Sequence, residues 1–265
     1  MGNIVGFCLV AVSLLSTPPA TAGELKEASS SILFSLGQNL SWASPSDIHF
    51  QGPGYNFTLH DATSHEDLQL DYRPDRTQYV VRIYYYWNDT FFFGIGMNHM
   101  KYILDSQVLR IRGEISSDIS SEYGGSYDQD VHVGAEGDIV EEFDHTDGVN
   151  FYDFQVGITR PTWESVEQTH RVTSSGALSL GFLWPRTKVI ALNRGQNQPY
   201  HISGYGAACL GIVRYHYGDT FFVDVSVKGG WLHYVNAYSF EPIGHTSQSY
   251  WFLESIITAG VPFRL

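Results

Sequence analysis

The chain has 265 residues, enough for one large domain, and its composition shows no break between two halves. Its 15 Lys and Arg stand against 28 Asp and Glu, and the formal net charge of -13 argues against nucleic-acid binding, which requires a basic surface. Aromatic residues make up 15% of the chain and there are 26 glycines, a mixture that favours a β-barrel over a helical bundle.

The first 22 residues have the pattern of an export signal. An apolar run from Ile4 to Leu15 is followed by the small residues Ala20-Thr21-Ala22. About a dozen apolar residues are too few for a membrane-anchoring helix, which needs roughly 20. We therefore expect residues 1–22 to be a signal peptide that is cleaved after Ala22, and residues 23–265 to form the mature domain.

Alternation between apolar and polar residues is the main pattern of the mature chain. No run of 18 apolar residues follows the signal, which argues against a helical span and leaves a soluble exported domain or a β-barrel. In the segment 221–228, Phe221 and three valines share one face of a strand, whereas Asp224 and Lys228 lie on the other. Similar alternation occurs at 81–87, 109–115, 152–158 and 176–184.

Alternation and turn residues together predict about ten strands, with eight or twelve as the alternatives. From a periplasmic amino terminus, an even number of strands returns the carboxyl end to the periplasm. The turn Tyr217–Thr220 is then periplasmic and the segments 116–148, 193–198 and 236–247 face outside, but the connection 61–77 is long for a periplasmic turn. The expected strands are 31–42, 47–60, 78–88, 90–102, 107–115, 149–159, 173–190, 199–216, 219–234 and 248–265.

The last predicted strand resembles the final strand of outer-membrane barrels that the barrel-assembly machinery recognises. Val261, Phe263 and Leu265 share one face of it, up to the last residue of the sequence. A terminal Phe or Trp is more usual than Leu at that position. This strand predicts insertion by the assembly machinery into a bacterial outer membrane.

A soluble β-sandwich would alternate as well, but two features favour a transmembrane antiparallel up-and-down β-barrel. Aromatic residues gather near strand ends, as in 84–87, where membrane interfaces place them. A charged strand face would also be costly in the dry core of a sandwich. We expect the charged faces to form an ion-pair network in the barrel lumen, made of Arg82, Arg110, Arg112, Asp153, Asp224 and Glu254.

Two short runs support a resemblance to a family. They are His99-Met100-Lys101-Tyr102, and His145-Thr146-Asp147-Gly148 with Asn150. Together with 40–42, 47–48 and 55–57, they make the chain resemble an uncharacterised family of bacterial outer-membrane β-barrel proteins. The resemblance covers most of the mature chain and implies location and fold. It implies no reaction, because the family has no assigned activity.

His99 and Lys101 are candidate catalytic residues, with His145 as a third. In a lumenal strand, the Lys101 ammonium would disfavour protonation of His99 and leave a neutral base suited to ester hydrolysis. The same strand face carries Phe91 and Phe93, which suggests instead that the pair marks where the strand leaves the hydrocarbon. We favour this second interpretation.

The stretch 116–148 contains ten acidic residues and no Lys or Arg. Oxygen ligands from Asp144, Asp147 and Asn150 would suit Ca²⁺ or Mg²⁺, either as a structural ion or as a bridge to lipopolysaccharide phosphates. No calcium-loop spacing is present, and a solvated acidic loop is the simpler interpretation. No other cofactor is predicted, and the identity of any metal is open.

Three functions are compatible with these observations. The first is a structural or surface-interaction barrel, expected to be a monomer, whose acidic outer loop contacts lipopolysaccharide, ions or another surface. The second is a lipid A or phospholipid hydrolase with His99 or His145 as the base, and the third is a narrow channel. We favour the first, because each catalytic candidate has a simpler structural explanation.

Overall fold

The computed structural model describes residues 31–66, 78–145, 148–197, 199–240 and 244–265, which form strands joined by turns and loops. The predicted signal peptide lies outside the described residues. Within the described ranges, no helix has the length and apolar character needed to cross a membrane.

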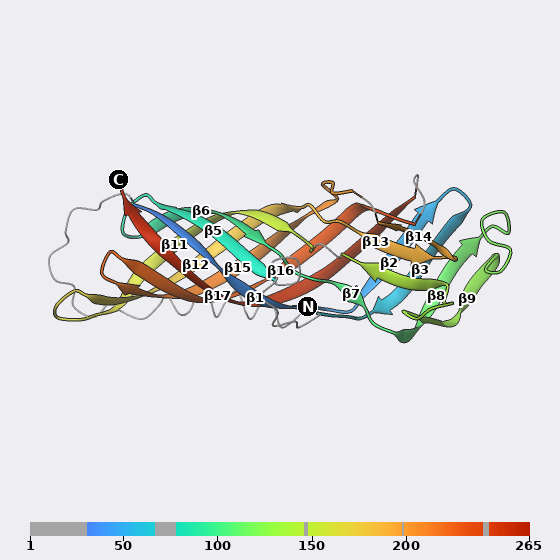
Figure 1. Cartoon of the computed structure of the whole chain (residues 1–265), viewed down its shortest axis with the longest axis horizontal. Helices are drawn as coiled ribbons and strands as arrows, with labels where there is room; N and C mark the ends of the chain where they lie inside the picture. Colours follow the sequence, from blue (N-terminus) through green and yellow to red (C-terminus); the bar gives the residue numbers. More distant parts are fainter. Residues whose placement is uncertain (1–30, 67–77, 146–147, 198, 241–243) are drawn as a thin grey trace.

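Eight antiparallel strands form a closed up-and-down barrel (Figure 1). Each strand pairs with the next, and the first and last strands close the ring along their full shared length, from Ser31 opposite Arg264 to Ala43 opposite Phe252. The predicted antiparallel up-and-down β-barrel is therefore confirmed. The eight strands are β1 (Ser31–Ala43), β5 (Tyr79–Tyr86), β6 (Phe91–Asn98), β11 (Phe151–Glu164), β12 (His170–Leu183), β15 (Gly204–Tyr217), β16 (Phe221–Tyr238) and β17 (His245–Arg264).

The two ends of the barrel have different connections. At the end that holds Ser31 and Arg264, short turns at 87–90, 165–169 and 218–220 join the strands. At the other end, the connections 44–78, 99–150 and 184–203 are long. The turn at 217–220 therefore lies at the short-turn end. The described residues of the segments 116–148, 193–198 and 236–247 lie at the other end, which is the grouping that the sequence predicts.

The long connections fold into an extension beyond the barrel mouth, made of two sheets (Figure 1). The extension sheet continues the barrel wall, because β2 pairs with the first residues of β17, with Gln51 opposite His245. Its strands are β2 (Ser46–Gly52), β3 (Tyr55–Ala62), β8 (Gln107–Ile115) and β9 (Gly125–Val133). The small sheet contains β14 (Arg194–Asn197), β13 (Lys188–Ala191), β10 (Val140–Asp144), β7 (Ile103–Leu104) and β4 (Ser64–His65), in spatial order.

Two of the ten predicted barrel strands lie in the extension instead. The segment 47–60 is the hairpin of β2 and β3, which reverses at Gly52-Pro53-Gly54, where Gly54 has a φ of 79°. The segment 107–115 is β8, which pairs with β3 and β9. The wall therefore has eight strands, the lower alternative. The connection after β3 also starts at the long-connection end, which removes the difficulty of a long periplasmic turn.

An apolar core fills the extension. Phe50 of β2 stacks on Phe57 of β3 at 4.9 Å between ring centroids, and Phe143 of β10 meets Phe50 edge-on at 5.7 Å. The same cluster of buried residues continues to Phe151 and Phe252 at the barrel mouth. The extension is thus a packed structure that is continuous with the barrel.

Candidate functional site

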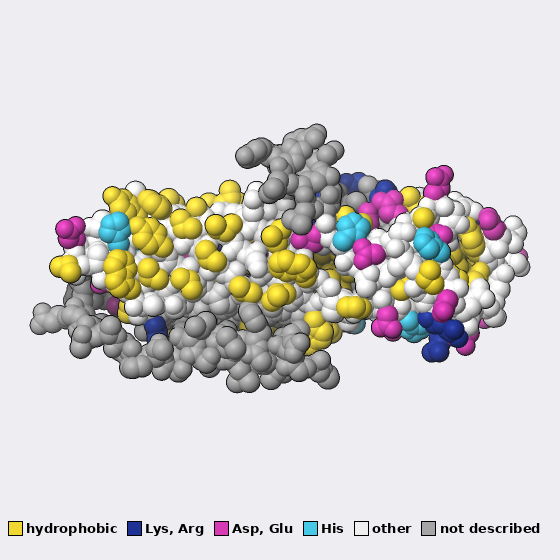
Figure 2. All heavy atoms as spheres, turned by 90° about the horizontal axis from the view of Figure 1, so that it is seen from below, with side chains coloured by type: hydrophobic (Ala, Val, Ile, Leu, Met, Phe, Trp, Pro, Cys, Tyr) yellow, Lys and Arg dark blue, Asp and Glu magenta, His cyan; other side chains and the backbone are white. Residues whose placement is uncertain are grey.

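The outward face of the barrel is predominantly apolar, and Gln38 of β1 and Ser255 of β17 are polar exceptions on it. In the middle of each strand, exposed aliphatic residues such as Val225 and Ile257 alternate with buried residues. Figure 2 shows hydrophobic side chains spread over the barrel half, whereas acidic, basic and histidine side chains lie on the extension half and at the short-turn end of the barrel. We call this surface the apolar belt; it includes Phe34, Leu36, Leu40, Trp42, Ile83, Phe91, Phe93, Ile95, Phe154, Val156, Leu178, Leu180, Val213, Phe221, Val225, Trp251, Leu253, Ile257 and Val261.

The inward face of the same strands carries buried ion pairs. Arg214 of β15 donates two hydrogen bonds to Asp224 of β16, at 2.6 Å from Nε to Oδ1 and 2.8 Å from Nη2 to Oδ2. Its Nη1 donates to the Tyr86 hydroxyl at 2.8 Å, and the guanidinium lies 4.4 Å from the Phe222 ring centroid. Two-point pairing of this kind fixes both side chains and compensates for burying the charges.

A second group of charges lies nearer the barrel mouth. Lys228 donates to Asp153 Oδ2 at 3.1 Å and faces Glu254 in the strand register. Glu254 accepts hydrogen bonds from the amides of Asn39 and Asn98. Asp153, Lys228 and Glu254 are all at most 3% exposed. Inside the barrel each charge is therefore stabilised by a partner of opposite charge and not by bulk water.

The predicted lumenal network is thus only partly placed in the lumen. Arg82, Asp153, Asp224 and Glu254 are buried inside the barrel, where Arg82 donates to the Ser226 hydroxyl at 3.1 Å. The prediction was wrong for Arg110 and Arg112. Both lie on β8 in the extension, exposed, and bond to Asp128 of β9, at 2.8 Å for Arg110 Nη2 and 2.9 Å for Arg112 Nε. Their strand does alternate, but its polar face meets water.

The two sequence runs meet at the barrel mouth. The Val149 N–H donates to the Met100 carbonyl at 2.7 Å, and the His145 N–H donates to the Tyr102 carbonyl at 3.0 Å. His99 Nδ1 also lies 2.8 Å from Asn150 Oδ1. Gly148 has a φ of 86°, and a Cβ there would collide with the His99 ring. The runs therefore join the barrel to the extension.

His99 does not lie on a strand as expected. β6 ends at Asn98, and His99 is buried beyond it, with its ring stacked on Tyr79 at 4.7 Å. Lys101 is half-buried in the same connection. The alternation argument that put the two side chains on one strand face does not apply there.

His145 lies in the apolar core of the extension. Its ring stacks on Tyr234 at 4.4 Å, and Nδ1 lies 3.1 Å from the Thr187 hydroxyl. Burial lowers the pKa of His145 to about 3, so the ring is neutral. His99 and His145 thus make separate contacts, with Asn150 and with Thr187.

Two of the predicted cation ligands, Asp144 and Asn150, have protein partners. Asp144 is buried beside Glu142 and Lys188, and burial, reinforced by the Glu142 carboxylate, raises its pKa to about 7. Lys188 bonds to Glu142 at 2.5 Å, and Asn150 contacts His99 and the Trp184 carbonyl. Asp147 lies outside the described residues. In the part of the chain that the structure describes, no group of three or more His, Cys, Asp or Glu residues is placed to hold a metal ion.

No family model matches the chain, and no curated protein does. Among solved structures, the chain is similar to the outer membrane protein AlkL in DMPC bilayers, with 10% identity over 94% of this chain and 97% of that chain and a TM-score of 0.42. It is also similar to Ail of Yersinia pestis in complex with the heparin analogue sucrose octasulfate (14% identity, 90% and 100% coverage, TM-score 0.33). A third is OprG of Pseudomonas aeruginosa (9% identity, 90% and 97% coverage, TM-score 0.39).

Proposed function

We propose that the chain is an integral outer-membrane β-barrel whose extension stands outside the cell and interacts with surface molecules. The observation that carries this proposal is the apolar belt around a closed ring of strands. A lipid bilayer accepts a sheet only if all backbone groups are paired within it, and ring closure meets that condition.

The height of the belt matches a membrane. On β16 it runs from Phe221 to Trp231, eleven residues, with Trp251 of β17 opposite Trp231. Eleven residues at about 3.3 Å each, tilted by about 45°, cover about 25 Å, close to the apolar band of outer-membrane barrels. Aromatic residues at both ends, such as Trp87 and Trp251, suit the two interfaces.

The extension carries the interaction role in this proposal. The end of the barrel that holds Ser31 and Arg264 has short turns, which suit the periplasm. The other end has long connections, which suit the outside of the cell. The exposed acidic residues of the extension, such as Asp118 and Glu136, would bind divalent cations that bridge them to lipopolysaccharide phosphates on the cell surface. We further propose a monomer that the barrel-assembly machinery inserts through the final strand.

The structure offers less support for the two other functions. An ester hydrolase needs a base and a nucleophile that the substrate can reach. His145 does lie beside the Thr187 hydroxyl, but both residues are only 1% exposed. His99 faces the Asn150 amide, which is not a nucleophile. A channel would have to displace the inward side chains of Arg214, Asp224 and Lys228, which are at most 1% exposed.

Fractionation and gel mobility test the proposal together. Membranes from expressing cells are separated by density, and the outer-membrane fraction is run with and without boiling in SDS. The proposal expects the chain in that fraction, with a shift in mobility on boiling. External protease should cleave the extension in intact cells. A chain found dissolved in the periplasm, with one mobility, would overturn it.

A further inference from the structure

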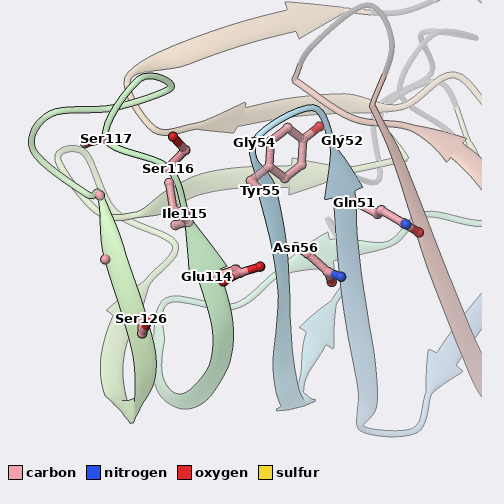
Figure 3. A pocket seen from close by; sticks show the side chains of 12 residues that line it. Gln51, Gly52, Gly54, Tyr55, Asn56, Glu114, Ile115, Ser116, Ser117 and Ser126 are labelled. Atoms are coloured by element: carbon pink, nitrogen blue, oxygen red, sulfur yellow. The ribbon is translucent and has the colours of Figure 1, made fainter.

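The far end of the extension holds a shallow pocket of about 720 Å³. Its twelve lining residues come from the β2–β3 hairpin and from the paired ends of β8 and β9 (Figure 3). The Ser116 N–H donates to the Gly54 carbonyl at 2.7 Å, which ties the hairpin turn to the end of β8. The pocket is therefore held by paired strands, and a ligand would bind with little ordering cost.

A row of four polar residues crosses the four strands at the pocket. Gln51 of β2 is opposite Asn56 of β3, Asn56 is opposite Glu114 of β8, and Glu114 is opposite Ser126 of β9. All four are exposed, on the sheet face away from the apolar core. Because neighbouring strands lie about 4.8 Å apart, the row presents one hydrogen-bonding group at intervals similar to the width of a sugar ring.

The charge of the pocket excludes anionic ligands. None of its lining residues is Lys or Arg, and Glu114 contributes a carboxylate. The nearby guanidinium of Arg112 is already held by Asp128. A chain with a net charge of -13 also repels phosphate, sulfate and sialic acid groups at long range.

The chemistry of the pocket also disfavours apolar ligands. The two large apolar lining residues, Tyr55 and Ile115, are buried at 2% and 3% exposure and offer little surface. The remaining polar groups are amides and hydroxyls, which both donate and accept hydrogen bonds, and a carboxylate, which accepts hydrogen bonds from two hydroxyl groups. A neutral ligand with several hydroxyl groups fits this set.

We propose that the Gln51–Asn56–Glu114–Ser126 row binds a neutral oligosaccharide, with the Glu114 carboxylate accepting hydrogen bonds from adjacent hydroxyl groups. This inference rests on the proposed function, since it names the class of surface molecule that the extension contacts. The site lies at the far end of the extension from the barrel, where a glycan of the cell's own surface or of another cell can reach it.

A glycan array tests the inference on the full chain. The protein is kept in the detergent LDAO, because detergents with sugar head groups would compete for the pocket. The array carries neutral, sialylated and sulfated oligosaccharides, and the affinity for the best neutral oligosaccharide is then measured by calorimetry. We expect binding to neutral oligosaccharides and a loss of affinity of tenfold or more in Asn56→Ala and in Glu114→Gln. Each variant removes hydrogen bonds to the ligand.

Asp130→Asn is the matched control. Asp130 lies on the same sheet face, on β9, and its substitution removes one carboxylate charge as Glu114→Gln does. Affinity should be unchanged in this variant. Polysaccharide released from the producing strain's lipopolysaccharide serves as a competitor: competition assigns the ligand to the cell's own surface, and its absence assigns it to another surface.

Three results would overturn the inference: no binding to any neutral oligosaccharide, binding to sulfated or sialylated glycans alone, or equal loss of affinity in Asp130→Asn. The gel mobility of the same samples separates these results from a failure of the proposed function. A barrel that shifts on boiling but binds no oligosaccharide leaves the membrane role intact and removes only the oligosaccharide.

Discussion

The barrel and the extension are both built from strands in which apolar and polar residues alternate, but the apolar residues lie on opposite faces. In the barrel they face outward, and in the extension they face inward. In the barrel half of β17, Glu254 and Thr258 point inward and Ile257 points outward. In the extension half of the same strand, Tyr250 points inward and Ser247 points outward. β16 changes in the same way, from inward Asp224 and Lys228 to inward Leu232.

The reversal shows that the solvent on each side determines which strand face is apolar. Around the barrel the proposed solvent is lipid, so apolar side chains face out and charges pair inside. Around the extension it is water, so the sheets pack apolar faces together as in a soluble sandwich. The boundary lies near Trp251, where the outward face of β17 changes from apolar to polar.

Two substitutions share the largest expected effect, and the first of them breaks the buried ion pair of the barrel. Arg214→Met leaves Asp224 charged and unpaired in the interior, so we expect a loss of about 3–5 kcal/mol in the free energy of unfolding. Urea titration of the barrel in lipid vesicles measures it. The double variant Arg214→Met/Asp224→Leu should recover most of the loss. If the double variant is as unstable as the single one, the loss of stability does not come from an unpaired Asp224 charge.

The core of the extension should respond separately. Phe50→Ala removes a ring packed on Phe57 and Phe143 and should cost about 3–5 kcal/mol in the stability of the extension. Limited proteolysis should then cleave the extension faster, while the boiled and unboiled mobilities stay distinct. Loss of the mobility difference in this variant would mean that the barrel depends on the extension.

A matched pair of arginine substitutions distinguishes the two exteriors. Val225 in the belt is 59% exposed and Val108 on β8 is 65% exposed, so the two side chains differ little in exposure. Val225→Arg, in the middle of the belt, should cost about 2–4 kcal/mol in vesicles. Val108→Arg should change the free energy of unfolding by less than about 0.5 kcal/mol. Equal losses of stability at the two positions would contradict the view that lipid surrounds Val225 and water surrounds Val108.

The smallest expected effect is the net pH dependence of the extension, because two buried groups act in opposite directions. The pKa of His145 is lowered to about 3 by burial, so between pH 6.5 and 3 the unfolded chain binds a proton that the folded chain does not. The extension should lose stability as the pH falls through this window. Asp144, whose pKa is raised to about 7, acts in the opposite direction, because its contribution falls as the pH rises from about 4 to 7.

Removing the opposing group isolates the histidine. Urea unfolding of Asp144→Asn should show decreasing stability on acidification from pH 6.5 to 3, and Asp144→Asn/His145→Phe should show a smaller decrease. Equal slopes in the two variants would contradict a neutral, buried His145.

Sequence alternation located all eight wall strands. A strand with one face toward an apolar medium and the other toward a polar interior must alternate apolar and polar residues. Alternation could not separate them from β2, β3 and β8, since a sandwich strand in water has the same period. That is why Arg110 and Arg112 were placed in the lumen. Arg214 was missed because its strand face also carries Leu210 and Ile212 in the segment 204–217, so alternation does not mark that face as the polar, inward one.

The site was harder to predict. The row from Gln51 to Ser126 depends on the pairing of four strands that are far apart in the sequence, and no local spacing reveals such a register. The contact between the runs at 99–102 and 145–150 also depends on pairing across the mouth of the barrel.

Quenching of the native tryptophans tests the apolar belt most directly. Trp42, Trp87, Trp163, Trp184 and Trp251 are all exposed on the barrel or at its ends, and Trp231 is partly exposed. In vesicles of brominated lipids, the account predicts strong quenching of their fluorescence, greater with bromine near the head group than near the chain end, and little quenching by aqueous iodide. Strong quenching by iodide with none by the lipids would contradict it.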